Sequence, residues 1–230
     1  MNAVDRFRNS IRRRAITMEV GGFRPPDSPF TSWFGRVSFM AAREEWPTHD
    51  GRPMVALAQV NMAEMPFRPP RMNDFDFLTV FVAAQGLPHA HEPNGSAWCL
   101  RTYTLDEVVA VEPPETGTHI RPFPMRPSVV EEDYPCHEDL VTVPSEELVQ
   151  DYHDAFDNQG GFKLGGWPTL IQSEIFWAPW QKHPATPEFV FQIDSCEKAG
   201  WQWGHGGVGY FGRGTAEGQR DVWAHEWQCL

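Results

Sequence analysis

The histidine pair His89 and His91 comes nearest to a metal-ligating motif in this sequence. Alternate residues of an extended segment point to the same side, so the two imidazoles could bind one ion. Zinc would need two further ligands, which Cys136, His137 or Glu138 could supply. Neither H-x-x-x-H nor C-x-x-C spacing occurs, and exposed loop histidines explain the pair better. We therefore predict no metal and no other cofactor.

Cys136 beside His137 could be imagined as a nucleophile with its base. Neighbouring residues of a strand point apart, however, so an ordinary loop cysteine is the better interpretation. No G-x-S-x-G or P-loop motif occurs, and no GK[ST] follows the glycine-rich segment 204–214. An enzyme would need His205 or His225 to meet a carboxylate in a concave site. The sequence leans away from catalysis, and we predict no catalytic residue.

Two glutamines, Gln59 and Gln192, each lie near the end of an apolar run. A buried amide needs partners for both its oxygen and its nitrogen, so it fixes local geometry. Asn61 and Asp194, two residues further on, point to the same face of their strands. These four residues could line a polar pocket. The commoner use of such glutamines is to bond unpaired backbone where strands splay, and we favour it.

The second half of the chain is dense in tryptophan, with five in 37 residues: Trp167, Trp177, Trp180, Trp201 and Trp203. Flat rings at this density could form a stacking platform for a sugar or a peptide. Tryptophan more often anchors a core or an interface, because it buries a large apolar area. We favour core packing for most of them.

A doubled pattern in the sequence indicates which strands position these residues. Gly35 lies 24 residues before Gln59, and Gly165 lies 27 residues before Gln192, with an aromatic strand following each time. We expect a single domain over 1–230, built from two related β-rich halves. The approximate halves are 25–111 and 145–230, and a segment rich in proline and acidic residues, 112–144, joins them.

Local patterns indicate which segments are regular. Apolar residues at helical spacing predict an amphipathic helix over 4–18 that packs one stripe on the body. An N-cap serine and a glycine pair predict a second helix over 145–159. Short apolar or alternating runs predict strands near 54–60, 78–84, 98–102, 189–193, 208–210 and 221–230. The fold class expected is α+β, with mixed and mostly antiparallel sheets.

Charge and composition restrict the partners. The net charge is −12, and residues 1–14 hold five arginines against one aspartate, so the rest of the chain carries −16. Such a body repels phosphate backbones and argues against nucleic acid as the main ligand. No apolar run approaches the roughly 18 residues that span a bilayer, and four scattered cysteines suggest a reducing compartment. We expect a cytoplasmic protein that neither binds nor crosses a membrane.

Several motifs resemble those of the YwqG-like proteins, a bacterial group classed as a domain of unknown function. The first half matches in Phe34-Gly35, Trp46-Pro47 and Leu57-Ala58-Gln59-Val60-Asn61. The second half matches in Leu164-Gly165-Gly166-Trp167-Pro168, Ile171-Gln172, Phe191-Gln192-Ile193-Asp194-Ser195, the segment 203–211 and Trp227-Gln228-Cys229. The resemblance covers roughly residues 30–85 and 160–230. It implies an α+β fold with no accepted enzymatic mechanism.

One position departs from that family pattern. This chain has His205 where the family usually places an aspartate after Trp-Gly, so any role that needs a carboxylate there is in doubt. If the halves are related, a site is best sought where the two copies differ, which favours the second copy. The candidate ligand- or partner-binding residues are Gln59, Asn61, Gln192, Asp194, Trp203 and His205.

Two functions follow as hypotheses. The first is a non-catalytic protein-binding module, an immunity protein that neutralises a bacterial toxin, because some members of the resembling family sit beside secreted-toxin genes. The acidic body and the lack of catalytic motifs agree with it. The second is a small-molecule or carbohydrate-binding protein that uses a tryptophan-lined cleft between the halves.

Overall fold

The computed structural model describes residues 3–89, 92–117, 120–140, 152, 156–173, 175, 180 and 182–230. The elements, in chain order, are α1 (Ala3–Ile11), β1 (Arg13–Val20), β2 (Trp33–Phe34), β3 (Phe39–Ala41), β4 (Thr48–His49), β5 (Arg52–Pro53), β6 (Val55–Asn61), β7 (Phe77–Val82), β8 (Trp98–Tyr103), β9 (Val108–Ala110), β10 (Phe123–Asp133), β11 (Lys163–Gly165), β12 (Pro187–Asp194), β13 (Val208–Gly214) and β14 (Trp223–Gln228), with short 3-10 helices at Met62–Glu64, His137–Asp139 and Glu197–Ala199.

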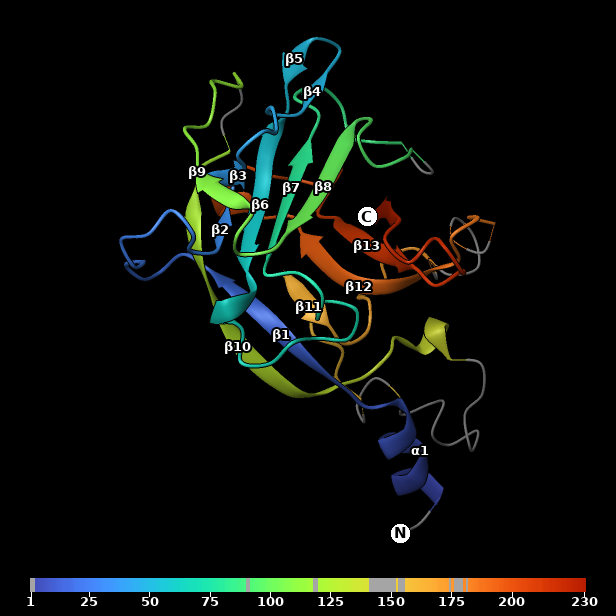
Figure 1. The fold of residues 1–230 in the computed structure, drawn as a ribbon. Helices are drawn as coiled ribbons and strands as arrows, with labels where there is room; N and C mark the ends of the chain where they lie inside the picture. Colours follow the sequence, from blue (N-terminus) through green and yellow to red (C-terminus); the bar gives the residue numbers. More distant parts are fainter. Residues whose placement is uncertain are drawn as a thin grey trace.

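One ten-stranded sheet dominates the fold, and its strand order is β14-β13-β12-β11-β1-β10-β2-β6-β7-β8. The order reads the same way from either edge: three long strands, then a short one, then a central strand. The centre is the antiparallel pair of β1 and β10, which lie side by side in Figure 1. The remaining strands form two small antiparallel pairs, β3 with β9 and β4 with β5.

The two halves of the sheet share their register. In the first half Trp33 faces Gln59, and in the second half Lys163 faces Gln192. A register shift opens β6 beside Leu57 and β12 beside Val190, in each case two residues before the glutamine. A bulge sharpens the twist of a strand, so both halves bend at the same point.

The sheet curls until side chains of its two edge strands meet. The Trp98 ring of β8 lies 5.3 Å from the His225 ring of β14, centroid to centroid, and 6.1 Å from that of Phe211. The main core fills this curve and draws on both halves, including Leu57 and Phe191, which are fully buried. Because one continuous core joins the halves, we expect neither half to fold alone.

The predicted α+β class is wrong, because the described residues are mostly strand and a single curled sheet organises them. The predicted helix over 4–18 is correct only as far as Ile11, where α1 ends, and β1 takes up Arg13–Val20. Pairing with distant strands explains why a strand replaces the second part of the predicted helix. Ile16 and its neighbours bond β10 on one side and β11 on the other, and β-branched residues such as Ile16 and Thr17 suit a strand. Figure 1 shows α1 standing apart from the sheet.

The segment 112–144 is not merely a surface connection, because it contains β10, the longest strand. Its prolines hide this: Pro124 and Pro127 cannot donate to a ladder, yet Pro124 accepts a hydrogen bond from Gly21 through its carbonyl, 2.7 Å. Most of the second predicted helix, 145–159, lies outside the described residues. Tyr152 is helical and its carbonyl accepts from the Phe156 N–H, 3.0 Å, whereas 156–159 are not helical. The strands predicted near 54–60, 78–84, 98–102, 189–193, 208–210 and 221–230 are confirmed as β6, β7, β8, β12, β13 and β14.

Candidate functional site

The two glutamines brace loops at equivalent places. Gln59 is fully buried, and its Oε1 accepts from the Ser38 backbone N–H, 2.7 Å. Its Nε2 donates to the carbonyls of Pro29, 3.0 Å, and Thr31. These contacts join the backbone on both sides of β2, where β2 is too short to pair along the whole of β6. Gln59 thus satisfies loop backbone that the sheet leaves unpaired.

Gln192 repeats the arrangement beside β11. Its Oε1 accepts from the Thr169 N–H, 2.8 Å, and its Nε2 donates to the Gly161 carbonyl, 3.2 Å, and to Asp194 Oδ1, 2.9 Å. Asp194 Oδ2 accepts from the Gly161 N–H, 2.7 Å. Burial raises the pKa of Asp194 to about 6, although these hydrogen bonds and Lys163 oppose the shift.

The other predicted site residues lie apart from these two. Asn61 accepts from the Ala63 N–H, 2.9 Å, and so begins a short 3-10 helix. Trp203 is fully buried and packs edge-on against Trp201, with ring centroids 5.0 Å apart. His205 is exposed in a turn, where its carbonyl accepts from the Leu230 N–H. The structure therefore gathers only Gln192 and Asp194 into one cluster.

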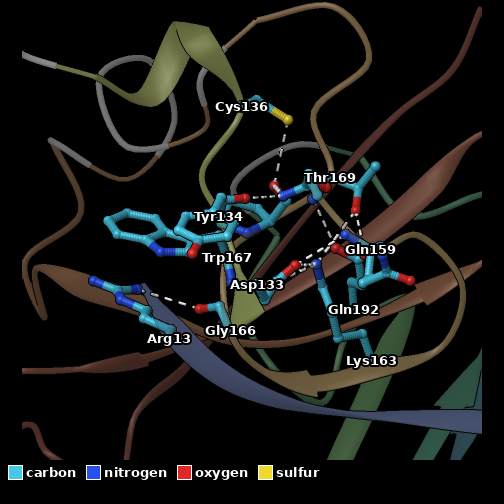
Figure 2. A network of polar contacts seen from close by, with 12 residues as sticks. Arg13, Asp133, Tyr134, Cys136, Gln159, Lys163, Gly166, Trp167, Thr169 and Gln192 are labelled. Carbon is cyan, nitrogen blue, oxygen red and sulfur yellow. Dashed lines mark hydrogen bonds and ion pairs between the residues drawn. The ribbon is translucent and has the colours of Figure 1, made fainter. Parts of the chain in front are cut away.

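The halves differ at the residues that face these glutamines. Where the first half has the half-buried Trp33, the second half has Lys163, whose side chain is fully buried. Its Nζ lies 3.1 Å from Oδ2 of Asp133, which is equally buried at the end of β10. Burial is the main influence on Lys163 and lowers its pKa, whereas Asp133 opposes that shift. Figure 2 shows this ion pair at the centre of a polar network.

Asp133 also holds the turn that follows β11. Its Oδ2 accepts from the Trp167 N–H, 2.7 Å, and its Oδ1 from the Gln159 N–H, 2.9 Å. Gly166, in the left-handed region at φ +70°, lets the turn pass this close, because an added Cβ would lie 2.2 Å from Asp133 Oδ2. A buried carboxylate thereby fixes the Trp167 backbone, and the indole N–H donates to the Ile11 carbonyl, 2.7 Å.

That indole forms one wall of a pocket of about 760 Å³. Three elements contribute to it: the start of β1, the turn after β11 with the start of β12, and the loop between β6 and β7. Its lining is rich in cations and rings: Arg13, Arg14, Arg68, Arg71, Phe67, Trp167 and Phe189, with Glu188 as a carboxylate. The β6–β7 loop belongs to the first half and the turn to the second, so the pocket lies between the halves.

The four arginines are held in different ways. Arg14, Arg68 and Arg71 each face a carboxylate, at 2.8 Å, 2.9 Å and 3.9 Å respectively. Arg13 instead stacks on Trp167, with its guanidinium carbon 3.4 Å from the ring centroid, and donates to the Gly166 carbonyl, 3.3 Å. Figure 2 shows this stacked pair beside the Asp133 network. Desolvation by the surrounding protein lowers the pKa of Arg13.

The equivalent place in the first half has a different chemistry. A smaller hollow of about 320 Å³ lies there, lined in part by Gly35, Arg36, Trp46 and Ile120. If the pairing of β1 with β11 and of β10 with β2 is extended by two to three residues, Ile120 takes the place of Arg13 and Arg36 that of Gly166. Of these two hollows in the described part of the chain, the one in the second half is lined by four arginines and the other by Arg36 alone.

The remaining sequence candidates contribute little to this pocket. His89 is exposed and His91 lies outside the described residues, as does Trp177. Among the described residues no three His, Cys, Asp or Glu side chains group as a metal site requires. Cys136 Sγ accepts from the Leu170 N–H, 3.4 Å. Trp180 is buried in the core. Among the described members of the five tryptophans, Trp167 lines the pocket.

Sequence reasoning missed the arginines of the pocket and the buried pair beneath it. The helix predicted over 4–18 would place Arg13 and Arg14 within a helix, and no motif singles out Arg68 or Arg71. One signal was present for Lys163, which lies between Phe162 and Leu164 in an apolar strand. A lone lysine in such a position calls for a buried partner.

In the described part of the chain, no helix has the length and hydropathy that crossing a bilayer requires.

Comparison with known proteins places the chain in a family. No curated protein matches the sequence. Residues 32–212 match a family described as a domain of unknown function (DUF1963), and this range spans β2 to most of β13, including the turn that carries Trp167. The chain therefore belongs to the DUF1963 family.

Proposed function

We propose that the protein is a non-catalytic binding module for a small anionic molecule with a flat apolar part, held in the pocket between the halves. The observation that carries this proposal is the pocket lining, in which four arginines and three aromatic rings gather in a protein of net charge −12. Guanidinium groups bind carboxylates and phosphates through paired N–H donors. The rings offer an apolar face to the rest of the ligand.

The size and electrostatics of the pocket agree with such a ligand. Its volume lies within the roughly 300–1,000 Å³ typical of small-molecule sites. Arg13 is the anchor of choice, because it is exposed at the pocket and its guanidinium is held by a ring and a carbonyl rather than by a carboxylate. A bound anion would compensate its charge, whereas Arg14 and Arg68 already face acidic side chains.

Isothermal titration calorimetry with naphthyl phosphate tests the proposal. Naphthol supplies the ring without the charge, naphthoate replaces phosphate by carboxylate, and inorganic phosphate supplies the charge without the ring. We expect naphthyl phosphate or naphthoate to bind more tightly than naphthol or inorganic phosphate. We expect Arg13→Gln to weaken that binding about tenfold or more, equivalent to about 1.4 kcal/mol.

Arg12→Gln is the matched control. Arg12 is the preceding residue, carries the same charge and pairs with Glu132 at 3.0 Å outside the pocket lining. It should change the affinity less than twofold. Equal losses in both variants would show that the anion responds to overall charge alone, and the pocket proposal would then fail.

A second candidate is a protein partner, including the toxin partner of an immunity protein. The observation in its favour is the charge of −16 outside residues 1–14, which suits a basic partner. A pull-down with the product of the neighbouring gene tests it. Recovery of that product in low salt, and its loss in high salt, is the expected result. No recovery in either condition would count against it.

We further propose a cytoplasmic location and a place among the YwqG-like members of the family. All four cysteines are free, and Cys99 is buried, which suits a reducing compartment. The resemblance of Leu164–Pro168 and Phe191–Ser195 to YwqG-like motifs supports the narrower grouping. Fractionation of a tagged protein expressed at its native level would test the location.

A further inference from the structure

An arginine on β13 clasps the β6–β7 loop from the other half of the molecule. Arg213 is almost fully buried, and its guanidinium forms a two-bond fork with Asp74, with both N–O distances 2.7 Å. It also donates to the Arg71 carbonyl, 2.8 Å, and to Asp221, 2.5 Å. Asp74 and Arg71 belong to the loop that forms one wall of the pocket, so this clasp connects the wall to the opposite half.

The contact is reciprocal. Arg71 donates through its own guanidinium to the Gly214 carbonyl, next to Arg213 in the chain. Arg71 also adopts a positive φ of 66°, an uncommon conformation for a residue with a side chain. The surrounding bonds must hold it there, and Arg213 provides two kinds of them, one to the Arg71 carbonyl and one to Asp74, three residues further along the loop.

We infer that Arg213 and Asp74 are positioning residues for anion recognition, which set the Arg71 guanidinium at the edge of the pocket. This inference rests on the proposed function, since it concerns the same pocket. A planar fork bound to a carboxylate fixes direction as well as distance, which a lysine at this place would not do. The clasp thus supplies what the loop sequence alone lacks, a defined place for the Arg71 side chain.

Two aspartates on the same arginine provide a matched pair of variants. Asp74→Asn weakens the fork to the β6–β7 loop, which forms a pocket wall, whereas Asp221→Asn weakens a bond to the connection between β13 and β14, which does not line the pocket. We expect Asp74→Asn to raise the dissociation constant for naphthyl phosphate at least fivefold and to leave that for naphthol unchanged. Asp221→Asn should change neither value more than twofold.

A double-mutant cycle separates positioning from a general loss of stability. If Asp74 acts through Arg71, then Asp74→Asn should have no further effect on naphthyl phosphate binding once Arg71→Gln is present. Additive effects, or equal losses for naphthyl phosphate and naphthol, would overturn the inference while leaving the pocket intact. Failure of the wild-type protein to prefer the charged probes would overturn the proposed function, and the inference with it. Thermal unfolding of each variant confirms that the compared proteins are folded.

Discussion

At the scale of single residues, the buried ion pair of Lys163 and Asp133 allows a test of how much stability is lost when a buried carboxylate loses its partner. Asp133 also accepts two backbone N–H groups, so it keeps part of its solvation when the lysine is lost. We expect Lys163→Met to lower the free energy of unfolding by about 3–5 kcal/mol, because it leaves an unpaired carboxylate in the core. Urea denaturation measures the change.

The control is an exposed pair in the same sheet. Arg126 and Glu19 are 2.5 Å apart, and both side chains are more than half exposed. Arg126→Met should cost no more than about 1 kcal/mol, since water screens such pairs. A cost for Lys163→Met as small as that of Arg126→Met would mean that water or a rearrangement replaces the buried partner.

Gly166 provides a second test on the same network. Gly166→Ala would bring a Cβ within 2.2 Å of the Asp133 carboxylate, and φ is positive as well. Gly218 has a similar φ, +73°, but nothing lies within 4 Å of an added Cβ. Gly218→Ala should therefore cost about 1 kcal/mol from the backbone alone, and Gly166→Ala clearly more. Equal losses in urea denaturation would show that the turn can move away from Asp133.

At the scale of elements, the two glutamines are equivalent devices on equivalent strands. Gln59→Ala and Gln192→Ala each leave buried backbone groups without a partner, so we expect each to cost about 1–3 kcal/mol in urea denaturation. Gln202, which is exposed, is the control, and Gln202→Ala should be nearly neutral. A neutral result for one buried glutamine only would indicate that the two loops are braced differently.

Pattern reasoning located most strands correctly because their signals are local. Val55–Val60 is apolar on both faces and forms β6, which packs on the main core on one side and a second cluster on the other. β1 was missed because its apolar residues also fit helical spacing as far as Met18. Only its pairing with β10 and β11 decides for a strand, and such pairing joins residues more than a hundred positions apart.

The candidate site could not be predicted from the sequence for the same reason. The pocket joins Arg13 and Arg14 to Arg68 and Arg71, which meet only because the β6–β7 loop folds across β11. An added Cβ on Gly165 would lie 3.0 Å from Pro69, so a glycine there permits this close crossing. The sequence shows the glycine, but the spacing of residues does not show that Pro69 packs against it.

At the scale of the whole molecule, the shared core predicts one unfolding transition. Residues of both halves, among them Val80 and Phe211, belong to a single buried cluster, and Arg213 clasps a loop of the opposite half. We expect calorimetric and van't Hoff enthalpies to agree, as they do for cooperative domains. Two separable transitions would show that the halves are independent folding units.

The pH dependence of stability should reflect one buried group, His225, and one half-buried group, Asp194, which act in opposite directions. Burial lowers the pKa of His225 to about 3, and in the described structure neither ring nitrogen has a hydrogen-bond partner. The unfolded chain therefore binds more protons at His225 between about pH 3 and 6.5, so this residue makes stability fall as the solution is acidified. Asp194, whose pKa is raised to about 6, holds its proton more firmly when folded and favours stability at low pH.

In urea denaturation from pH 7 to 4.5 we expect His225→Phe to lose less stability than the wild-type protein and Asp194→Asn to lose more. Parallel curves for all three proteins would mean that neither group governs the acid response.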